Sequence, residues 1–452
     1  MDRTAALGGW RGRIFLVTSL LTASTLTFLS TAASGQDNNV KVLTLNEALK
    51  IAAQRNWNIQ KAREYRNYVE GRYVEERAAA LPQLTIYVNG VNSNDESQEA
   101  LGPQAPSKRN TRAAELGLSQ ALFTWGQVSA GIRAAKVGLA TADDQLQIFQ
   151  QAAFRDVSAS FYDILLAKEI NSIAIQNLEQ KTRHFDEADK KYALGVATDY
   201  DVLVSKVDID NARPAVIRSE NLIRIARERL RFLLATDGQE VDAQGSLETA
   251  VEPYPKFEDA LEVAFKNRPE VSDIHHRVQI AEEFVTIAKA GDKPRLDLKG
   301  GYGWRDLDLG PNRQEDGAAW SIGLFVTYPI FDGLRTKGRV SQTKSVVSTL
   351  KIEEGKLLDG IRLEVRDACN AVREAGEIIK ALSGTVAQAE RLLTMAEKGY
   401  EYGVKTRLDV DDAQLNLVQA KGNLTRAKRD YVVALINLEY VKGTLREKEK
   451  ER

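Results

Sequence analysis

The sequence contains the same pattern twice, and this repeat constrains the fold more than any other feature. Leu45–Leu49 resembles Phe257–Leu261, which begins 212 positions later (257 minus 45), and Phe123 corresponds to Phe331, 208 positions later (331 minus 123). A single length difference in one polar loop explains the change of offset. Such internal similarity indicates two copies of one structural unit. We expect residues 36–245 and 246–452 to form two structural repeats, each ordered as helix, strand, loop, strand, long helix, tight turn and helix.

The long helices are predicted from apolar residues that alternate spacings of four and three. This spacing runs from Ile361 to Tyr400 and, after a turn, from Val410 to Val441. Sustained 3.5-residue spacing is typical of helices that pack as coiled coils. A helix from about Leu334 to Lys398 would contain roughly 65 residues and be about 97 Å long.

Four shorter segments have a different, two-residue period. One side of each segment is apolar and the alternate positions are polar or small; the apolar residues are Leu84, Ile86, Val88; Leu116, Leu118; Leu296, Leu298, Tyr302, Trp304; and Trp320, Ile322, Leu324, Val326, Tyr328. Alternation over about ten residues with aromatic residues near the ends is typical of lipid-facing barrel strands. A half-exposed soluble sheet would give a similar pattern, but four such segments in an exported chain favour the membrane.

Export is predicted from the N-terminus, where residues 1–35 have the order of a signal peptide. Arg3, Arg11 and Arg13 precede the largely apolar stretch Ile14–Leu29, and small residues follow it. An N-terminal membrane anchor is the alternative, although the apolar stretch is short for a span, which needs about 20 residues. Beyond residue 40 no run of 18 apolar residues occurs, so the chain is expected to enter a membrane as strands.

Two hairpins cannot close a barrel alone. An open sheet edge is not tolerated in hydrocarbon, and the smallest such barrels have eight strands. Two copies would give eight strands around a filled interior, whereas three would give twelve strands around a lumen. We therefore predict a mixed α+β membrane protein in which each chain contributes four strands to a trimeric twelve-stranded β-barrel.

Composition argues against several other functions. Formal net charge is −1, from 62 basic and 63 acidic residues, so no basic excess exists for binding nucleic acid. The single cysteine, Cys369, excludes an internal disulfide framework. The three histidines, His184, His275 and His276, fall on helical stretches without a nucleophile or a ligand cluster. We expect no enzyme activity, no catalytic residue, no cofactor and no metal site.

The segment from Lys398 to Asp412, with supporting stretches Ala121–Gly126 and Pro329–Gly333, resembles the TolC family of outer-membrane efflux proteins. The resemblance covers roughly Leu43 to Leu445. It implies a homotrimer in the outer membrane whose β-barrel contacts lipid and continues into a periplasmic α-barrel of long coiled-coil helices. It also implies a passive exit duct in a tripartite efflux or type I secretion system. The partners would be a periplasmic membrane-fusion adaptor and an inner-membrane pump of ABC, RND or MFS type, and the pump would choose among drug, protein and metal cargo.

The two interhelical turns, at 193–201 and 401–409, carry the candidate functional residues. Gly195 and Gly403 can adopt the left-handed conformation that ends a helix. Thr198 and Thr406 can cap the next helix, with Asp201 and Asp409 completing an approximate capping box. By resemblance, two short motifs at these turns meet the adaptor: Leu194, Gly195, Val196, and Tyr402, Gly403, Val404. Tight turns alone would also explain these motifs.

The resemblance further implies a channel gate at the same end. Asp409 and Asp412 match aspartates that line the constricted entrance, although a capping role alone would also explain Asp409. Tyr400 and Lys405 match the residues that restrain the gate, with Tyr200 and Asp201 in the partner positions. Lys405 replaces the family's arginine and lacks its planar fork, so its restraint should be looser. Asp411 lies on a different helix face and is expected to be solvent-exposed.

The rival interpretation is an exported structural coiled-coil protein or adaptor without a pore. It shares the helices but gives no reason for four barrel-type strands.

Overall fold

The computed structural model describes residues 40–94, 108–236, 238–308 and 314–445. The predicted signal peptide, residues 1–35, lies outside the described residues, and the bounds of the two repeats stay a prediction. Within the described parts, no helix is long and apolar enough to cross a membrane.

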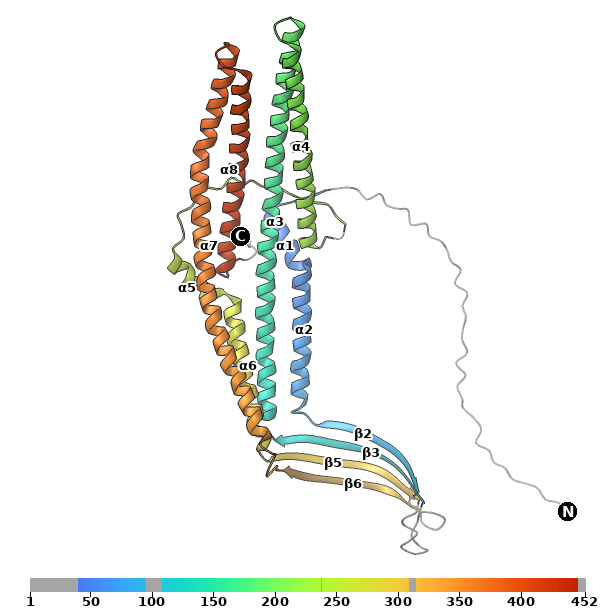
Figure 1. Cartoon of the computed structure of the whole chain (residues 1–452). Coiled ribbons are helices and arrows are strands. Elements are labelled where there is room, and N and C mark those ends of the chain that lie inside the picture. The colour runs from blue at the N-terminus through green and yellow to red at the C-terminus, as the bar shows by residue number, and fades with distance from the viewer. Residues whose placement is uncertain (1–39, 95–107, 237, 309–313, 446–452) are drawn as a thin grey trace, which may run out of the picture. The chain divides into compact units, whose positions relative to one another are not determined.

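The two halves of the chain have the same order of elements (Figure 1). The first half contains α1 (Leu45–Arg55), α2 (Trp57–Ala78), β2 (Gln83–Asn94), β3 (Lys108–Phe123), α3 (Gln127–Ala193) and α4 (Asp199–Leu234). The second contains α5 (Phe257–Asn267), α6 (Pro269–Lys289), β5 (Arg295–Asp308), β6 (Gln314–Thr327), α7 (Arg335–Glu401) and α8 (Arg407–Val441). Each β-hairpin is thus preceded by two helices, where the sequence predicted one. The internal duplication is confirmed.

The break between the paired helices has a local cause in each half. Asn56 separates α1 from α2, and its side chain accepts hydrogen bonds from the amides of Asn58 and Ile59, which caps α2. In the second half, Pro269 begins α6, a position where the missing N–H of proline costs no helical hydrogen bond.

The two β-hairpins join into a single antiparallel sheet of order β2-β3-β5-β6. β3 pairs with β5 from Asn110 opposite Asp308 to Phe123 opposite Leu296. β2 and β6 are therefore the edge strands. A separate parallel pair links β1 (Lys41–Leu43) to β4 (Val241–Ala243); the sequence analysis did not predict these three-residue strands.

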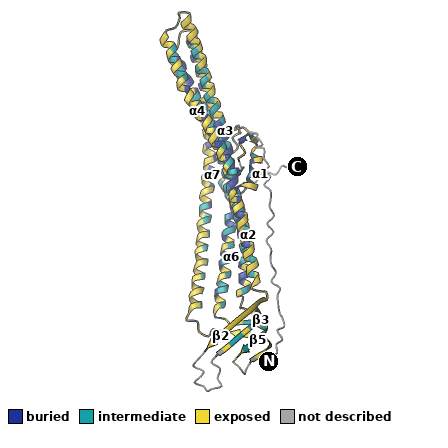
Figure 2. Ribbon diagram, turned by 90° about the vertical axis from the view of Figure 1, so that its right-hand side faces the viewer, coloured by how far each residue is buried: buried dark blue, intermediate teal, exposed yellow. Residues whose placement is uncertain are grey.

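The helices form two long antiparallel hairpins, α3–α4 and α7–α8, and α3 also packs against α8. α3 and α7 contain 67 residues each, close to the length predicted for the second. The regularly spaced apolar residues predicted for α7 and α8 lie between the helices. Among them, Ile361, Val365, Val372 and Tyr431 are buried in one cluster. A second cluster joins α1, β1 and β4 to α3 and α4. Figure 2 shows buried residues concentrated where α1 meets α3, and mostly exposed or half-exposed residues on α4 near its turn.

Candidate functional site

The four-stranded sheet has one apolar face and one polar face. Successive side chains on a strand point to opposite faces, and the observed register brings residues of one kind opposite each other. The apolar face consists of rows across the sheet, Leu84–Leu118–Gly300–Ile322, Ile86–Leu116–Tyr302–Trp320 and Val88–Ala114–Trp304–Ala318. These large side chains are exposed in the single chain, with Trp320 at 75% and Ile322 at 64%. They need a cover that the described part of the chain does not supply.

The length of this apolar face suits a lipid bilayer. From the Leu296–Val326 pair to the Trp304–Ala318 pair it extends eight residues along β5, or about 27 Å. At the tilt of about 35–45° usual for barrel strands, this length gives a height of about 19–22 Å, comparable with the apolar band of about 25 Å typical of outer-membrane barrels. At the loop end, Arg112 and Asp306 form an ion pair of 3.9 Å beyond Trp304. At the helix end, the exposed rings of Phe123 and Trp125 meet edge to face, 5.2 Å apart.

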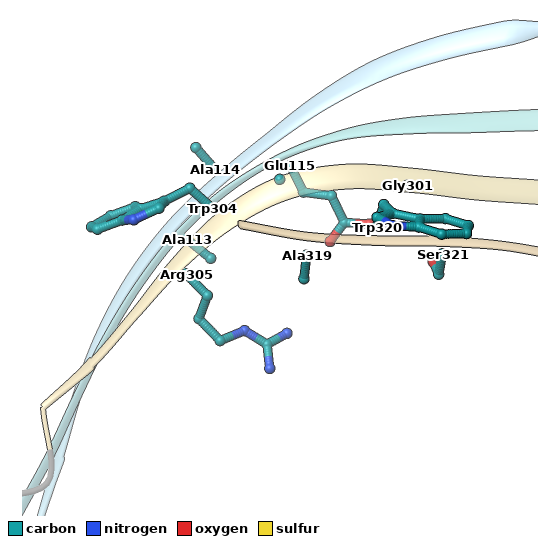
Figure 3. A pocket seen from close by; sticks show the side chains of 10 residues that line it. Ala113, Ala114, Glu115, Gly301, Trp304, Arg305, Ala319, Trp320 and Ser321 are labelled. Carbon is teal, nitrogen blue, oxygen red and sulfur yellow. The ribbon is translucent and has the colours of Figure 1, made fainter. Parts of the chain in front are cut away.

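The opposite face is polar, and its middle is lined by small residues. The row Thr85–Gly117–Gly301–Ser321 lies beside Tyr87–Glu115–Gly303–Ala319. A side chain at Gly301 would place its Cβ 2.2 Å from Oε1 of Glu115, so the glycine makes room for Glu115 to lie across β5. A shallow hollow of about 150 Å³ results (Figure 3). In Figure 3, Trp304 and Arg305 extend from opposite sides of the same strand, as the alternation predicts.

The two helical turns have the predicted local structure. Gly195 and Gly403 have φ values of 75° and 73°, in the left-handed region. A Cβ at either position would meet nothing within 4 Å, so backbone conformation, not crowding, favours glycine here. The exposed apolar side chains beside these glycines are Leu194 at 78%, Val196 at 75%, Tyr402 at 77% and Val404 at 79%.

Both capping boxes are present. The hydroxyl of Thr198 accepts from the Asp201 amide, and Asp201 Oδ2 accepts from the Thr198 amide at 2.9 Å. Thr406 and Asp409 repeat the arrangement with an amide-to-carboxylate distance of 2.8 Å. These bonds from the threonine amide and hydroxyl lower the pKa of both aspartates, so both carboxylates are held in the charged form.

The predicted gate residues fall into separate local environments. Lys405 lies in the turn before α8, and its Nζ is 3.3 Å from Oδ1 of Asp409 in the first turn of that helix. The half-buried Tyr400 packs against the apolar cluster of α7 and α8, and the ammonium of Lys191 lies 5.1 Å from its ring centre. Asp412 and Tyr200 are exposed. In the described chain Tyr400 and Asp201 are not hydrogen-bonded to each other, and the gate roles stay a prediction.

The expectation for Asp411 was wrong. Its side chain is only 24% exposed, and Oδ1 accepts from Lys181 Nζ at 2.7 Å while Oδ2 accepts from Arg407 Nε at 3.2 Å. Helix periodicity placed Asp411 on a different face from Asp409, but that face meets α3. Lys181 is 230 residues away in the chain, so no local pattern could have revealed this partner.

The two adjacent histidines of α6 contact different helices. His275 Nε2 lies 2.9 Å from Glu354 on α7, and His276 Nδ1 lies 2.6 Å from Asp144 on α3. Among the described residues, no group of three or more metal-ligating side chains comes together. Each histidine joins two helices through a carboxylate.

Comparison with known proteins identifies one family. The profile of the family described as "Outer membrane efflux protein" matches residues 48–236 and 260–444, one segment in each half. The outer membrane protein TolC of Vibrio cholerae is 22% identical over 384 residues, covering 82% of this chain and 84% of that protein. The TolC of Escherichia coli is 23% identical over 390 residues, covering 83% and 77%. The crystal structure of the Campylobacter jejuni CmeC outer membrane channel has the same fold, with a TM-score of 0.78 at 16% identity, covering 90% of this chain and 87% of that one.

Proposed function

Because the chain belongs to the outer membrane efflux protein family, we propose that three copies of it form a passive exit duct for a tripartite efflux or type I secretion system. The family consists of channel and transport proteins, so the resemblance to the TolC family and the expected localisation, in the outer membrane and extending into the periplasm, are confirmed.

The observation that carries the proposal is the two-faced sheet with two open edges. In hydrocarbon, the unpaired backbone groups of β2 and β6 would each cost several kcal/mol, roughly as for any unsatisfied polar group. Pairing β6 of one copy with β2 of the next removes both edges. Three copies give twelve strands, with the apolar face toward lipid and the face with Glu115 and Ser321 toward a lumen.

The long hairpins would extend this lumen as a periplasmic α-barrel. Threefold symmetry would place three copies of Asp409 and three of Asp412 around the axis at its end. The capping bonds hold Asp409 charged, and a ring of carboxylates in a constriction favours cations over anions. Asp409 can cap the helix and also belong to this ring of carboxylates, because only its Oδ2 accepts from Thr406, while its Oδ1 faces Lys405.

The exposed turns would dock a periplasmic membrane-fusion adaptor, which in turn contacts an inner-membrane pump of ABC, RND or MFS type. Leu194 and Val196 on one turn, and Tyr402 and Val404 on the other, are large apolar side chains that project beyond a glycine. Exposed apolar groups at the end of a hairpin suit burial by a partner helix pair.

Native mass measurement in detergent, followed by planar-bilayer recording, tests the duct. We expect a trimer that inserts and conducts weakly at rest. A monomeric mass in detergent, together with recovery of the protein in the soluble fraction of the cell, would overturn the proposal. That result would favour the rival exported coiled-coil or adaptor protein.

The gate assignment has its own test. We expect Tyr400→Phe combined with Asp201→Ala to raise the conductance of the resting channel. Asp201→Ala also removes a helix cap, so the control is Thr198→Ala, which removes the cap and keeps the carboxylate. Equal conductance in the double variant and the wild type would refute the gate role, and an equal rise in Thr198→Ala would assign the effect to capping.

A further inference from the structure

Four charged side chains form a closed ring where the two helical hairpins meet. We call Lys181 on α3, Asp208 on α4, and Arg407 and Asp411 on α8 the charge ring. Lys181 Nζ lies 2.7 Å from Asp411 and 3.4 Å from Asp208. Arg407 lies 3.2 Å from Asp411 and 3.8 Å from Asp208. Each cation therefore faces both anions, and the ring carries no net charge.

The ring is largely shielded from water, as is the Arg429–Asp163 pair, which also joins α8 to α3 and is 24% and 29% exposed. The side chains of the ring are 14–26% exposed. By contrast, the Arg213–Asp210 pair, also on α4, is 64% and 58% exposed. Exposed pairs contribute little because water screens them, whereas removing one member of a shielded pair leaves its partner charged and unpaired. The hydrogen bond from Gln414 to Asn177, at 3.2 Å, lies on the same boundary between α8 and α3.

The ring is not part of the duplicated structure. At the offset of 208 that relates the two hairpin turns, Lys181 corresponds to Ala389 and Asp208 to Asn416, while Arg407 corresponds to Asp199 and Asp411 to Leu203. The capping boxes and turn glycines, in contrast, occur in both halves. A hairpin therefore does not need these charges to form, and they occur only where one hairpin touches the other.

We infer that the charge ring is a latch that holds the two hairpins of one subunit together at the periplasmic end and so keeps the proposed channel closed. This inference rests on the proposed function. Arg407 is the first residue of α8 and directly follows the capping Thr406, so the ring attaches the tip of the second hairpin to the side of the first. Moving that tip outward breaks the two contacts that cross between the hairpins, Lys181–Asp411 and Arg407–Asp208, and leaves each cation with only the anion of its own hairpin. The partner surface that opens the channel must offset this loss.

Conductance of the reconstituted full-length protein tests the latch. Lys181→Met keeps the side-chain length and removes the charge, and Asp411→Asn keeps the shape. We expect each to raise the open-to-closed ratio by at least about fivefold, the lower end of typical coupling between two sites. The double variant should rise little further, because residues of one network are not additive. The matched control is Asp210→Asn, two residues from Asp208 on α4, which should behave as the wild type.

A second measurement reports on hairpin contact without requiring conduction. Gln180 on α3 donates to Glu397 on α7 at 3.0 Å, so cysteines at these positions, in a Cys369→Ala background, can be joined by a short bis-maleimide. Lys181→Met should lower the cross-linked yield in the intact trimer. Unchanged yield and conductance would overturn the latch and leave the duct intact. A lowered yield in a protein that forms no channel would support the latch contact and refute the duct.

Discussion

Placing an arginine at the centre of the apolar face should destabilise the assembled protein severely. Ile322 is the middle residue of Ala318, Trp320, Ile322, Leu324 and Val326 on β6, and its neighbour on β5 is Gly300, which offers no side chain to shield a charge. Each end of this series, Ala318 and Val326, is four residues away, about 13 Å along the strand. An arginine at 322 can therefore reach the membrane surface only with difficulty.

The magnitude follows from this depth. An arginine at the middle of a bilayer costs about 2–4 kcal/mol in an outer-membrane barrel, and threefold symmetry would make the cost about 6–12 kcal/mol per trimer. Ser321 provides a matched control, because it is the adjacent residue but lies on the polar face beside Gly301. An arginine there would face the lumen and the carboxylate of Glu115, so Ser321→Arg should change stability little.

The assay is the temperature at which the purified trimer dissociates on an unheated-sample gel. We expect Ile322→Arg to lower that temperature strongly or to prevent assembly, and Ser321→Arg to remain near the wild type. Equal behaviour of the two variants would refute the assignment of the faces and, with it, the lipid-facing sheet.

Three further outcomes are expected. Replacing both Gly195 and Gly403 by valine should cost about 1–2 kcal/mol at each left-handed position and abolish export while the trimer persists; preserved export would argue for a simple turn. Thr406→Ala should lower the free energy of unfolding by about 1 kcal/mol through loss of the helix cap, speed amide exchange in the first turn of α8 and raise the pKa of Asp409. Thr406→Ser keeps the hydroxyl and should have none of these effects. Burial lowers the pKa of His184, and the nearby cations of Arg407 and Lys181 lower it further, against the opposing effect of the carboxylates of Glu187 and Asp411. The fourth member of the charge ring, Asp208, pairs with Lys181. As the pH falls, the imidazole of His184 is therefore protonated in the unfolded chain before it is protonated in the folded one. The free energy of unfolding should decrease as the pH drops below about 6.5. His184→Gln should remove part of this pH dependence of the unfolding temperature; an identical dependence would contradict it.

Local patterns in the sequence were sufficient to predict the four long strands, the long helices and the caps at the two helical turns. The alternating Leu84, Ile86 and Val88 predicted a strand with one apolar side, and the spacing from Ile361 to Tyr400 predicted a helix face. Thr406 and Asp409 form the predicted capping box because both partners lie within one turn. These features depend on neighbours three or four residues away, so they can be recognised in a single sequence.

Features that depend on distant partners could not be predicted. Asp411 was expected to face solvent because its partner Lys181 lies in the other half of the chain. The short strands β1 and β4 have only three residues each and are held by long-range contacts: Asp242 in β4 accepts from Lys168 at 2.8 Å and from Arg227 at 2.9 Å. The break between the two helices before each β-hairpin was also missed, although its signals, Asn56 and Pro269, are local.

The length of α3 and α7 has a mechanical consequence. At 67 residues each, these helices are rods of about 100 Å. Rotating such a rod by about 5° at its sheet end would displace the far end by about 9 Å, by the geometry of a lever of that length. A restraint near the far end acts with the longest possible lever arm, so a few modest contacts there can oppose a torque that many contacts near the sheet could not.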